Sequence, residues 1–206
     1  MKRILLPLVS MILLLPSPVS AWGPRTHLEI AARLDEGDEF KLGSILPDMA
    51  LAMSYAGFET EDAPKKQRAL HSQEFVEALP EGDFARGWGC HIVSDAIEEA
   101  YAEEVGSADF AVDSFYDTDC DVRITERHKS IIQEALNESY PGLWEITDKE
   151  WRHIELAYRG YLAWYDVLFP DMDTSKFHDH EYYVWRSVFE SCLHVKGTMV
   201  KEAVII

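Results

Sequence analysis

A histidine and an aspartate stand four residues apart, at His91 and Asp95, in the segment GWGCHIVSD. On a helix this spacing brings both side chains to one face, where they could reach a common cation. Imidazole nitrogen together with carboxylate oxygen is a ligand set well matched to zinc. Alone the pair is a weak indication, because hydrogen-bonded pairs of this kind are also common on helix surfaces.

The first 21 residues have the pattern of a secretory signal peptide. A basic start at Lys2-Arg3 precedes an apolar run over residues 4–15, and Val19-Ser20-Ala21 has the small side chains of a cleavage site. A membrane anchor is the competing interpretation, but three prolines and a short apolar core argue against a span. We therefore expect a secreted or periplasmic chain, residues 22–206, whose first residue is Trp22.

Three more potential ligands follow Trp22 in order, namely His27, Asp48 and His71. Each residue has a structural interpretation as well: the histidines as hydrogen-bonded helix residues, Asp48 as a turn residue and Trp22 as a core aromatic. The combination and its order favour a metal site.

With these residues in this order, the chain resembles the zinc-dependent phospholipase C family, which is related to the fungal single-strand nucleases. The resemblance covers about residues 22–98. It implies that the amino group and carbonyl oxygen of Trp22 bind one zinc ion together with His27, and that Asp95 bridges this ion to a second. The second ion would be held by Asp48, His71, His91 and Asp95.

The resemblance implies hydrolysis of a phosphodiester by a metal-activated water. Two zinc ions would lower the pKa of a bound water towards about 7 and neutralise the charge that develops on the phosphate. Asp48 is the candidate catalytic residue, as general base or as the group that orients the water. A phospholipid is the first expected substrate. Two alternatives stay open: a nuclease or nucleotidase of the same superfamily, and a non-catalytic metal-binding relative.

The sequence departs from the family pattern where a third zinc ion is expected. The relatives have another histidine soon after H-x-x-x-D and a later H-x-x-x-E or H-x-x-x-D pair, whereas here Asp95 is followed by AIEEAY and no later histidine has an acidic residue four positions on. Two ions are therefore expected, or a third site of altered composition. The residues left open for a third ion are Glu98, Glu99, His128, Glu134, His178 and His180.

Helical periodicity runs through the mature sequence, with no alternating strand pattern, and predicts an all-α, single-domain bundle that resembles the phospholipase C and single-strand nuclease fold. Residues 46–48 are expected in a loop and residues 109–121 in an exposed acidic connector. The helices are expected over about residues 26–37, 67–79, 84–105, 122–138, 148–169 and 178–200, with Thr26 as the first N-cap. The aromatic residues of the fifth of these helices, residues 148–169, are expected to pack in the core.

The chain is strongly acidic, with 19 basic and 37 acidic side chains among 206 residues and a formal charge of -18. This charge opposes binding to polynucleotides and anionic lipid surfaces, so nucleic acid is the less expected partner, although the nuclease alternative stays open. The resemblance implies a small-molecule or lipid phosphodiester as substrate and allows transient contact with a membrane surface, and no stable protein partner is implied. The three cysteines, Cys90, Cys120 and Cys192, cannot form a disulfide framework, and their pairing is left open.

Overall fold

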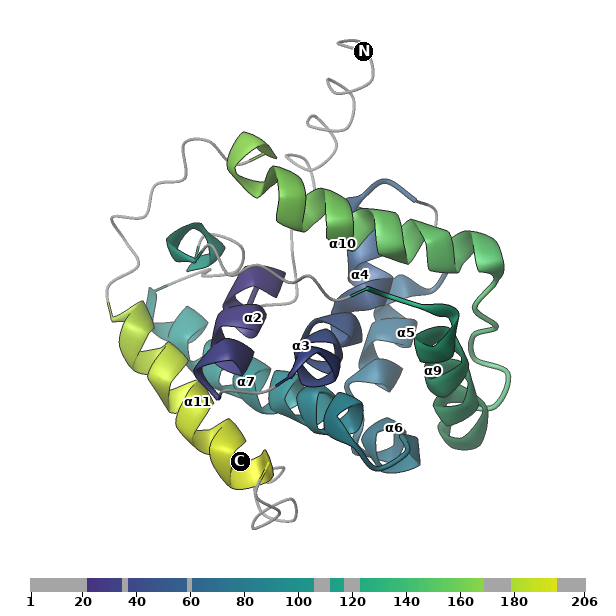
Figure 1. Cartoon of the computed structure of the whole chain (residues 1–206), viewed down its shortest axis with the longest axis horizontal. Helices are drawn as coiled ribbons and strands as arrows, with labels where there is room; N and C mark the ends of the chain where they lie inside the picture. Colours follow the sequence, from purple (N-terminus) through teal and green to yellow (C-terminus); the bar gives the residue numbers. More distant parts are fainter. Residues whose placement is uncertain are drawn as a thin grey trace. The chain divides into compact units, whose positions relative to one another are not determined.

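The computed structural model describes residues 22–34, 37–58, 61–105, 112–116, 123–168 and 179–195. All regular structure in these ranges is helical (Figure 1), which confirms the all-α prediction. The expected signal peptide, Cys120 and His178 lie outside the described residues. Among the described helices, none is both long enough and apolar enough to cross a membrane.

The described residues belong to two compact units, each built from separate stretches of the chain. One, which we call the α10 unit, contains residues 47–80 and 124–168. The other, the α7 unit, contains the described parts of residues 22–46, 81–123 and 179–195. The expectation of a single domain stays a prediction.

The α7 unit is built around the long helix α7 (Asp83–Val105), which packs against α3 (Asp38–Ile45) and α11 (His180–Val195). Glycines let the backbones of α3 and α7 touch. A Cβ atom at Gly43 would lie 2.1 Å from the Phe84 carbonyl oxygen, and one at Gly87 would lie 2.0 Å from the Phe40 carbonyl oxygen. A side chain at either position would therefore push the two helices apart.

Helix α2 (Pro24–Arg33) begins against a buried carboxylate distant in sequence. Asp113, in the short 3₁₀ turn η2 (Asp113–Phe115), is fully buried and accepts hydrogen bonds from the backbone N–H groups of Arg25 and Thr26, both at 2.9 Å. The prediction of an exposed connector is wrong here, because unsatisfied N–H groups at a helix start attract an anion. Thr26 is not the N-cap; that position is Gly23.

The core of the α7 unit contains the aromatic side chain of Trp22, which is 1% exposed and stacks on Tyr101 with ring centroids 5.5 Å apart. Apolar residues of α2, α3 and α11 join the same cluster. Gly37 does not end the first helix as expected: α2 ends at Arg33 and Gly37 is the N-cap of α3. Helix α3 occupies a stretch for which no helix was predicted.

The α10 unit contains α4 (Met49–Tyr55), α5 (Ala63–Leu70), α6 (Gln73–Ala78), α9 (Glu126–Ser139) and α10 (Asp148–Leu168). The expected loop at residues 46–48 is a 3₁₀ turn, η1 (Leu46–Asp48), which connects α3 directly to α4. Proline fits such a turn because its φ is helical and the first N–H groups of a helix need no partner within it.

Two helix boundaries in the α10 unit differ from the predictions. The single helix expected over residues 67–79 is divided, because the Ser72 hydroxyl accepts a hydrogen bond from Phe75 N–H at 3.2 Å and starts α6 anew. Helix α9 begins at Glu126 rather than near residue 122, with Thr125 as its N-cap. The expected core role is confirmed for Trp151 and Tyr158 of α10, which are both buried.

Candidate metal centre

His91 lies on α7 with no exposed surface and its ring is held by α3. Its Nδ1 atom is 2.8 Å from the carbonyl oxygen of Ser44. Because a carbonyl can only accept, Nδ1 carries the hydrogen and the other ring nitrogen, Nε2, has a lone pair when the ring is neutral. That Nε2 lies 3.1 Å from Oδ2 of Asp95, one turn further along α7.

His27 lies on α2, is 1% exposed, and stacks on the His91 ring with centroids 3.9 Å apart. Its Nδ1 atom is 3.1 Å from Ser94 Oγ, and that hydroxyl donates its own hydrogen to the His91 carbonyl oxygen at 2.8 Å. Ser94 Oγ must then accept from Nδ1–H of His27. The remaining nitrogen, His27 Nε2, lies 3.2 Å from Oδ1 of Asp95.

His71 is the C-cap of α5 in the α10 unit. Its ring is held in the same way as the rings of His27 and His91, with Nδ1 bonded to an oxygen and Nε2 facing a carboxylate. Its Nδ1 atom donates to the carbonyl oxygen of Gln67 at 3.0 Å, and its Nε2 lies 3.5 Å from Oδ1 of Asp48. The same Asp48 oxygen accepts a hydrogen bond from Gln67 Nε2 at 2.5 Å. The break between α5 and α6 therefore places His71 at a helix end, where its ring can reach back to Gln67.

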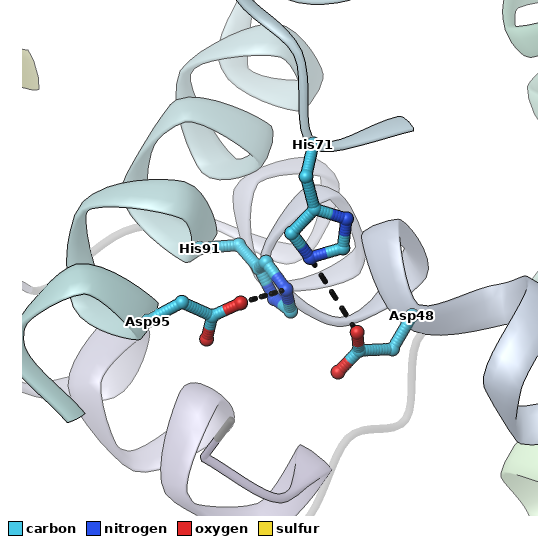
Figure 2. Close-up of side chains that lie close together, drawn as sticks. All are labelled: Asp48, His71, His91 and Asp95. Atoms are coloured by element: carbon cyan, nitrogen blue, oxygen red, sulfur yellow. Dashed lines mark ion pairs between the residues drawn. The ribbon is translucent and has the colours of Figure 1, made fainter. Parts of the chain in front are cut away.

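One ligand atom from each of four predicted residues converges. The ligand atoms of Asp48, His71, His91 and Asp95 all lie within 4.8 Å of one another. Figure 2 shows the four side chains turned toward one another, with the two aspartate–histidine contacts dashed. The four residues could hold a metal ion, as predicted.

Around Asp95, the hydrogen-bond pattern fits a cation better than it fits the bare side chains of His27 and His91. With neutral rings, three Nε2 lone pairs face carboxylate oxygens that are themselves acceptors, at 3.1–3.5 Å. Protonating the rings would instead place two positive charges in the stacked pair of His27 and His91, which share the single carboxylate of Asp95. A cation between the lone pairs and the carboxylates removes both conflicts, and this donor set suits zinc and related divalent metals.

Asp95 is placed to serve two histidines at once. Its Oδ1 faces His27 and its Oδ2 faces His91, so each oxygen of one carboxylate has its own imidazole. A carboxylate that presents its two oxygens to separate ligand groups can bridge two ions. The contact between His27 and Asp95 was not predictable from spacing, because α2 and α7 are distant in sequence.

Trp22, like His27, is an expected ligand that does not belong to the four-residue cluster, so its role as a ligand stays a prediction. Its indole lies in the core against Tyr101, and its chain leads directly into α2, which carries His27. The amino group that cleavage would expose depends on residue 21, which lies outside the described residues.

The residues left open for a third ion do not assemble a site among the described residues. His128 closes a capping box with Thr125 at the start of α9, and His180 stacks on Phe115 with centroids 4.0 Å apart. Glu99 and Glu134 are exposed, whereas Glu98 is fully buried on α7.

Several residues around the cluster were missed by sequence reasoning. Ser44, Gln67 and Ser94 supply the acceptors that orient the three histidine rings. Gln67 had a sequence signal, since it lies four residues before His71 on the same helical face. Ser44 and Ser94 had none, because each orients a histidine of another helix. Tyr158 was expected only in the core; burial, and then the negative charge of Asp48, raise its pKa well above the usual range, so it stays protonated.

The chain matches no family model, no curated protein and no solved structure. Fold and site together define an all-helical protein in which two aspartates and two histidines form a cluster able to hold a metal ion.

Proposed function

We propose that this chain is an exported, zinc-dependent phosphodiesterase related to the zinc-dependent phospholipase C family, with a phospholipid as substrate. One observation carries the proposal. Each of three histidines uses Nδ1–H for a hydrogen bond to an oxygen and turns Nε2 toward a carboxylate at 3.1–3.5 Å. Metal-ligating histidines in enzymes have this arrangement, with the outer nitrogen bonded to an acceptor that fixes the ring.

Two ions account for all the expected ligands. One would be held by Asp48, His71, His91 and Asp95, and the other by His27 and Asp95 together with the amino group of Trp22. When bound, such a pair supplies an activated water near neutral pH and positive charge for the phosphate. The acidic chain thereby gains, at one point, the positive charge that phosphodiester chemistry requires.

The exposure of the ligands indicates which of them meet the substrate. His27 and His91 are at most 1% exposed, whereas the side chains of Asp48 and Asp95 are each 14% exposed and that of His71 is 22% exposed. Solvent therefore reaches the two carboxylates and His71 rather than the stacked histidines. Asp48 is the carboxylate positioned to take a proton from the attacking water, whose oxygen bonds to phosphorus as the ester P–O bond breaks and the alcohol leaves with a proton.

The formal charge of -18 favours a lipid or small phosphodiester over a polynucleotide, because a long polyanion would be repelled. The test is to assay the exported, zinc-loaded protein on phosphatidylcholine, single-stranded nucleic acid and an aryl phosphodiester. We expect turnover of phosphatidylcholine and of the aryl ester, abolished in His91→Ala and kept in His153→Ala. His153 is a suitable control because it stacks on Phe58, outside the cluster.

Three results would change the proposal. Faster turnover of nucleic acid than of lipid would favour the nuclease alternative. Zinc binding without turnover of any substrate would favour a non-catalytic relative. Absence of bound zinc in protein purified without chelators would refute the metal site itself.

A further inference from the structure

Gln67 on α5 contacts both potential ligands of the α10 unit, although it is not itself one of them. Its side-chain Nε2 donates to Oδ1 of Asp48 at 2.5 Å, and its backbone carbonyl accepts from Nδ1 of His71 at 3.0 Å. The same Nε2 lies 3.3 Å and 3.4 Å from the two ring nitrogens of His71, so the amide packs on the ring. One residue thus fixes both the carboxylate and the imidazole.

The orientation of the Gln67 amide is determined by its neighbour. Reversing nitrogen and oxygen would bring two acceptors, the amide oxygen and Oδ1 of Asp48, into contact at hydrogen-bond distance. The donor must therefore face Asp48, and the amide oxygen Oε1 must point elsewhere.

That amide oxygen is the unusual atom of the residue. Gln67 is only 5% exposed, and its Oε1 is a buried acceptor that has no hydrogen-bond partner among the described residues. A buried acceptor without a donor is energetically costly, so such an atom is expected to meet a donor that the described residues do not supply, such as a bound water. Here the atom belongs to the amide whose N–H bonds to Asp48, the proposed base.

We propose that Gln67 is a positioning residue with two roles: its N–H orients Asp48 as a ligand, and its buried Oε1 accepts a hydrogen bond from the attacking water. This inference rests on the proposed function. The first role acts on metal affinity, because groups bonded to ligands typically change affinity by about 10–100-fold. The second acts on turnover, since a water held by two acceptors, Asp48 and Oε1, has its lone pair directed at phosphorus.

Two substitutions separate the roles. Gln67→Met keeps the length, the helix propensity and the backbone carbonyl that binds His71, but removes both amide atoms. Gln67→Glu keeps an acceptor and replaces the donor by a charge that repels Asp48. The control is Gln73→Met on α6, where the exposed amide donates a hydrogen bond to Glu77 at 2.7 Å, away from the cluster.

The measurements are zinc affinity by calorimetry, and kcat and KM on an aryl phosphodiester at saturating zinc. For Gln67→Met we expect zinc binding weaker by about 10–100-fold and, at saturating zinc, a lower kcat with KM unchanged. For Gln67→Glu we expect weakened zinc binding but a smaller loss of kcat than in Gln67→Met. Gln73→Met should match the wild type in every measurement.

The outcomes distinguish this inference from the proposed function. Unchanged zinc affinity and kcat in Gln67→Met, with a wild type that binds zinc and turns over, would overturn the role of Gln67 alone. Equal losses of kcat in Gln67→Met and Gln67→Glu would overturn the water contact. A wild type that binds no zinc would overturn the proposed function and this inference with it. Thermal unfolding of each variant shows whether a loss of zinc affinity or of kcat follows from misfolding instead. If Gln67→Met does not fold, the zinc affinity and kcat of Gln67→Glu, compared with the wild type, decide whether Gln67 has a role.

Discussion

The α7 unit and the α10 unit hold their potential metal ligands in different ways. In the α7 unit, His27, His91 and Asp95 are oriented by helix-to-helix contacts and the two histidines are almost completely buried. In the α10 unit, Asp48 and His71 lie at helix ends, are partly exposed, and are oriented through one residue, Gln67. The buried histidines are held by contacts between helices, whereas the partly exposed pair depends on one residue, Gln67, through its side chain at Asp48 and its backbone carbonyl at His71.

The strongest test of the difference between the two units is at Asp95, whose two carboxylate oxygens face two histidines, His27 and His91. We expect Asp95→Ala to weaken metal binding by more than about 100-fold, because loss of a ligand exceeds the 10–100-fold typical of groups behind ligands. Both ions should be lost, whereas His71→Ala should lose one. Metal analysis of the purified variants measures this, with Asp83→Ala as control, an exposed aspartate on the same helix. Equal metal loss in Asp95→Ala and His71→Ala would contradict bridging.

The second test concerns the amino group of Trp22. A protein that retains Ala21 has an amide in place of that amine, and an amide nitrogen is a poor ligand because it carries no available lone pair. We expect two ions in a protein that begins at Trp22 and one in a protein that begins at Ala21. Metal analysis together with intact mass decides the matter, and two ions in both would remove Trp22 from the ligand set.

Sequence predicted the ligands of the α7 unit better than their surroundings. The pair His91 and Asp95 was predictable because both lie on one long helix, so the i, i+4 rule fixes their common face. The order of residues added Asp48 and His71 through the resemblance, and the structure brings them to the same cluster. The helices around Asp48 were not predicted, because α3 and α4 are short and their apolar residues show no clear period.

The contacts that orient the ligands were harder to predict because most join distant segments. Ser44 reaches His91 only because Gly43 and Gly87 let two backbones touch. Asp113 was predicted to be exposed, because it lies in an acidic stretch of the sequence, yet it is buried at the start of α2. Neither contact has a signal in local sequence, since each depends on packing between helices far apart along the chain.

The third test concerns this buried acid. Asp113→Ala removes the acceptor for two N–H groups at the start of α2, the helix that carries His27. We expect the free energy of unfolding to fall by about 2–3 kcal/mol, as for loss of a buried charged hydrogen-bonding group. Urea unfolding measures this, with the exposed Asp38→Ala as control. A change below about 0.5 kcal/mol, the usual range for surface substitutions, would mean that Asp113 does not hold α2.

The smallest effect is expected at the other end of α2. Arg33 donates two hydrogen bonds to Glu181 of α11, at 2.9 Å and 3.0 Å, and these bonds hold the pKa of Glu181 below its usual value. A depressed pKa adds stability above the unfolded pKa of about 4.3, and this stability is lost as the pH falls through the folded pKa.

Because Glu181 is half exposed, solvent screens the pair, and Glu181→Gln should cost less than about 1 kcal/mol at pH 7. The difference from the wild type should shrink below about pH 4. Urea unfolding at several pH values measures it. A difference that does not depend on pH would show that packing, rather than charge, connects α2 to α11.

The central claim is that three histidines present Nε2 to metal ions. A long-range ¹H–¹⁵N spectrum of the histidine rings, recorded on the exported protein before and after zinc is added, tests it most directly. We predict that, of the eight histidines, His27, His71 and His91 have their hydrogen on Nδ1 and that zinc shifts only their Nε2 signals. Hydrogen on Nε2 in any of the three, or zinc-dependent shifts confined to the other five, would contradict it.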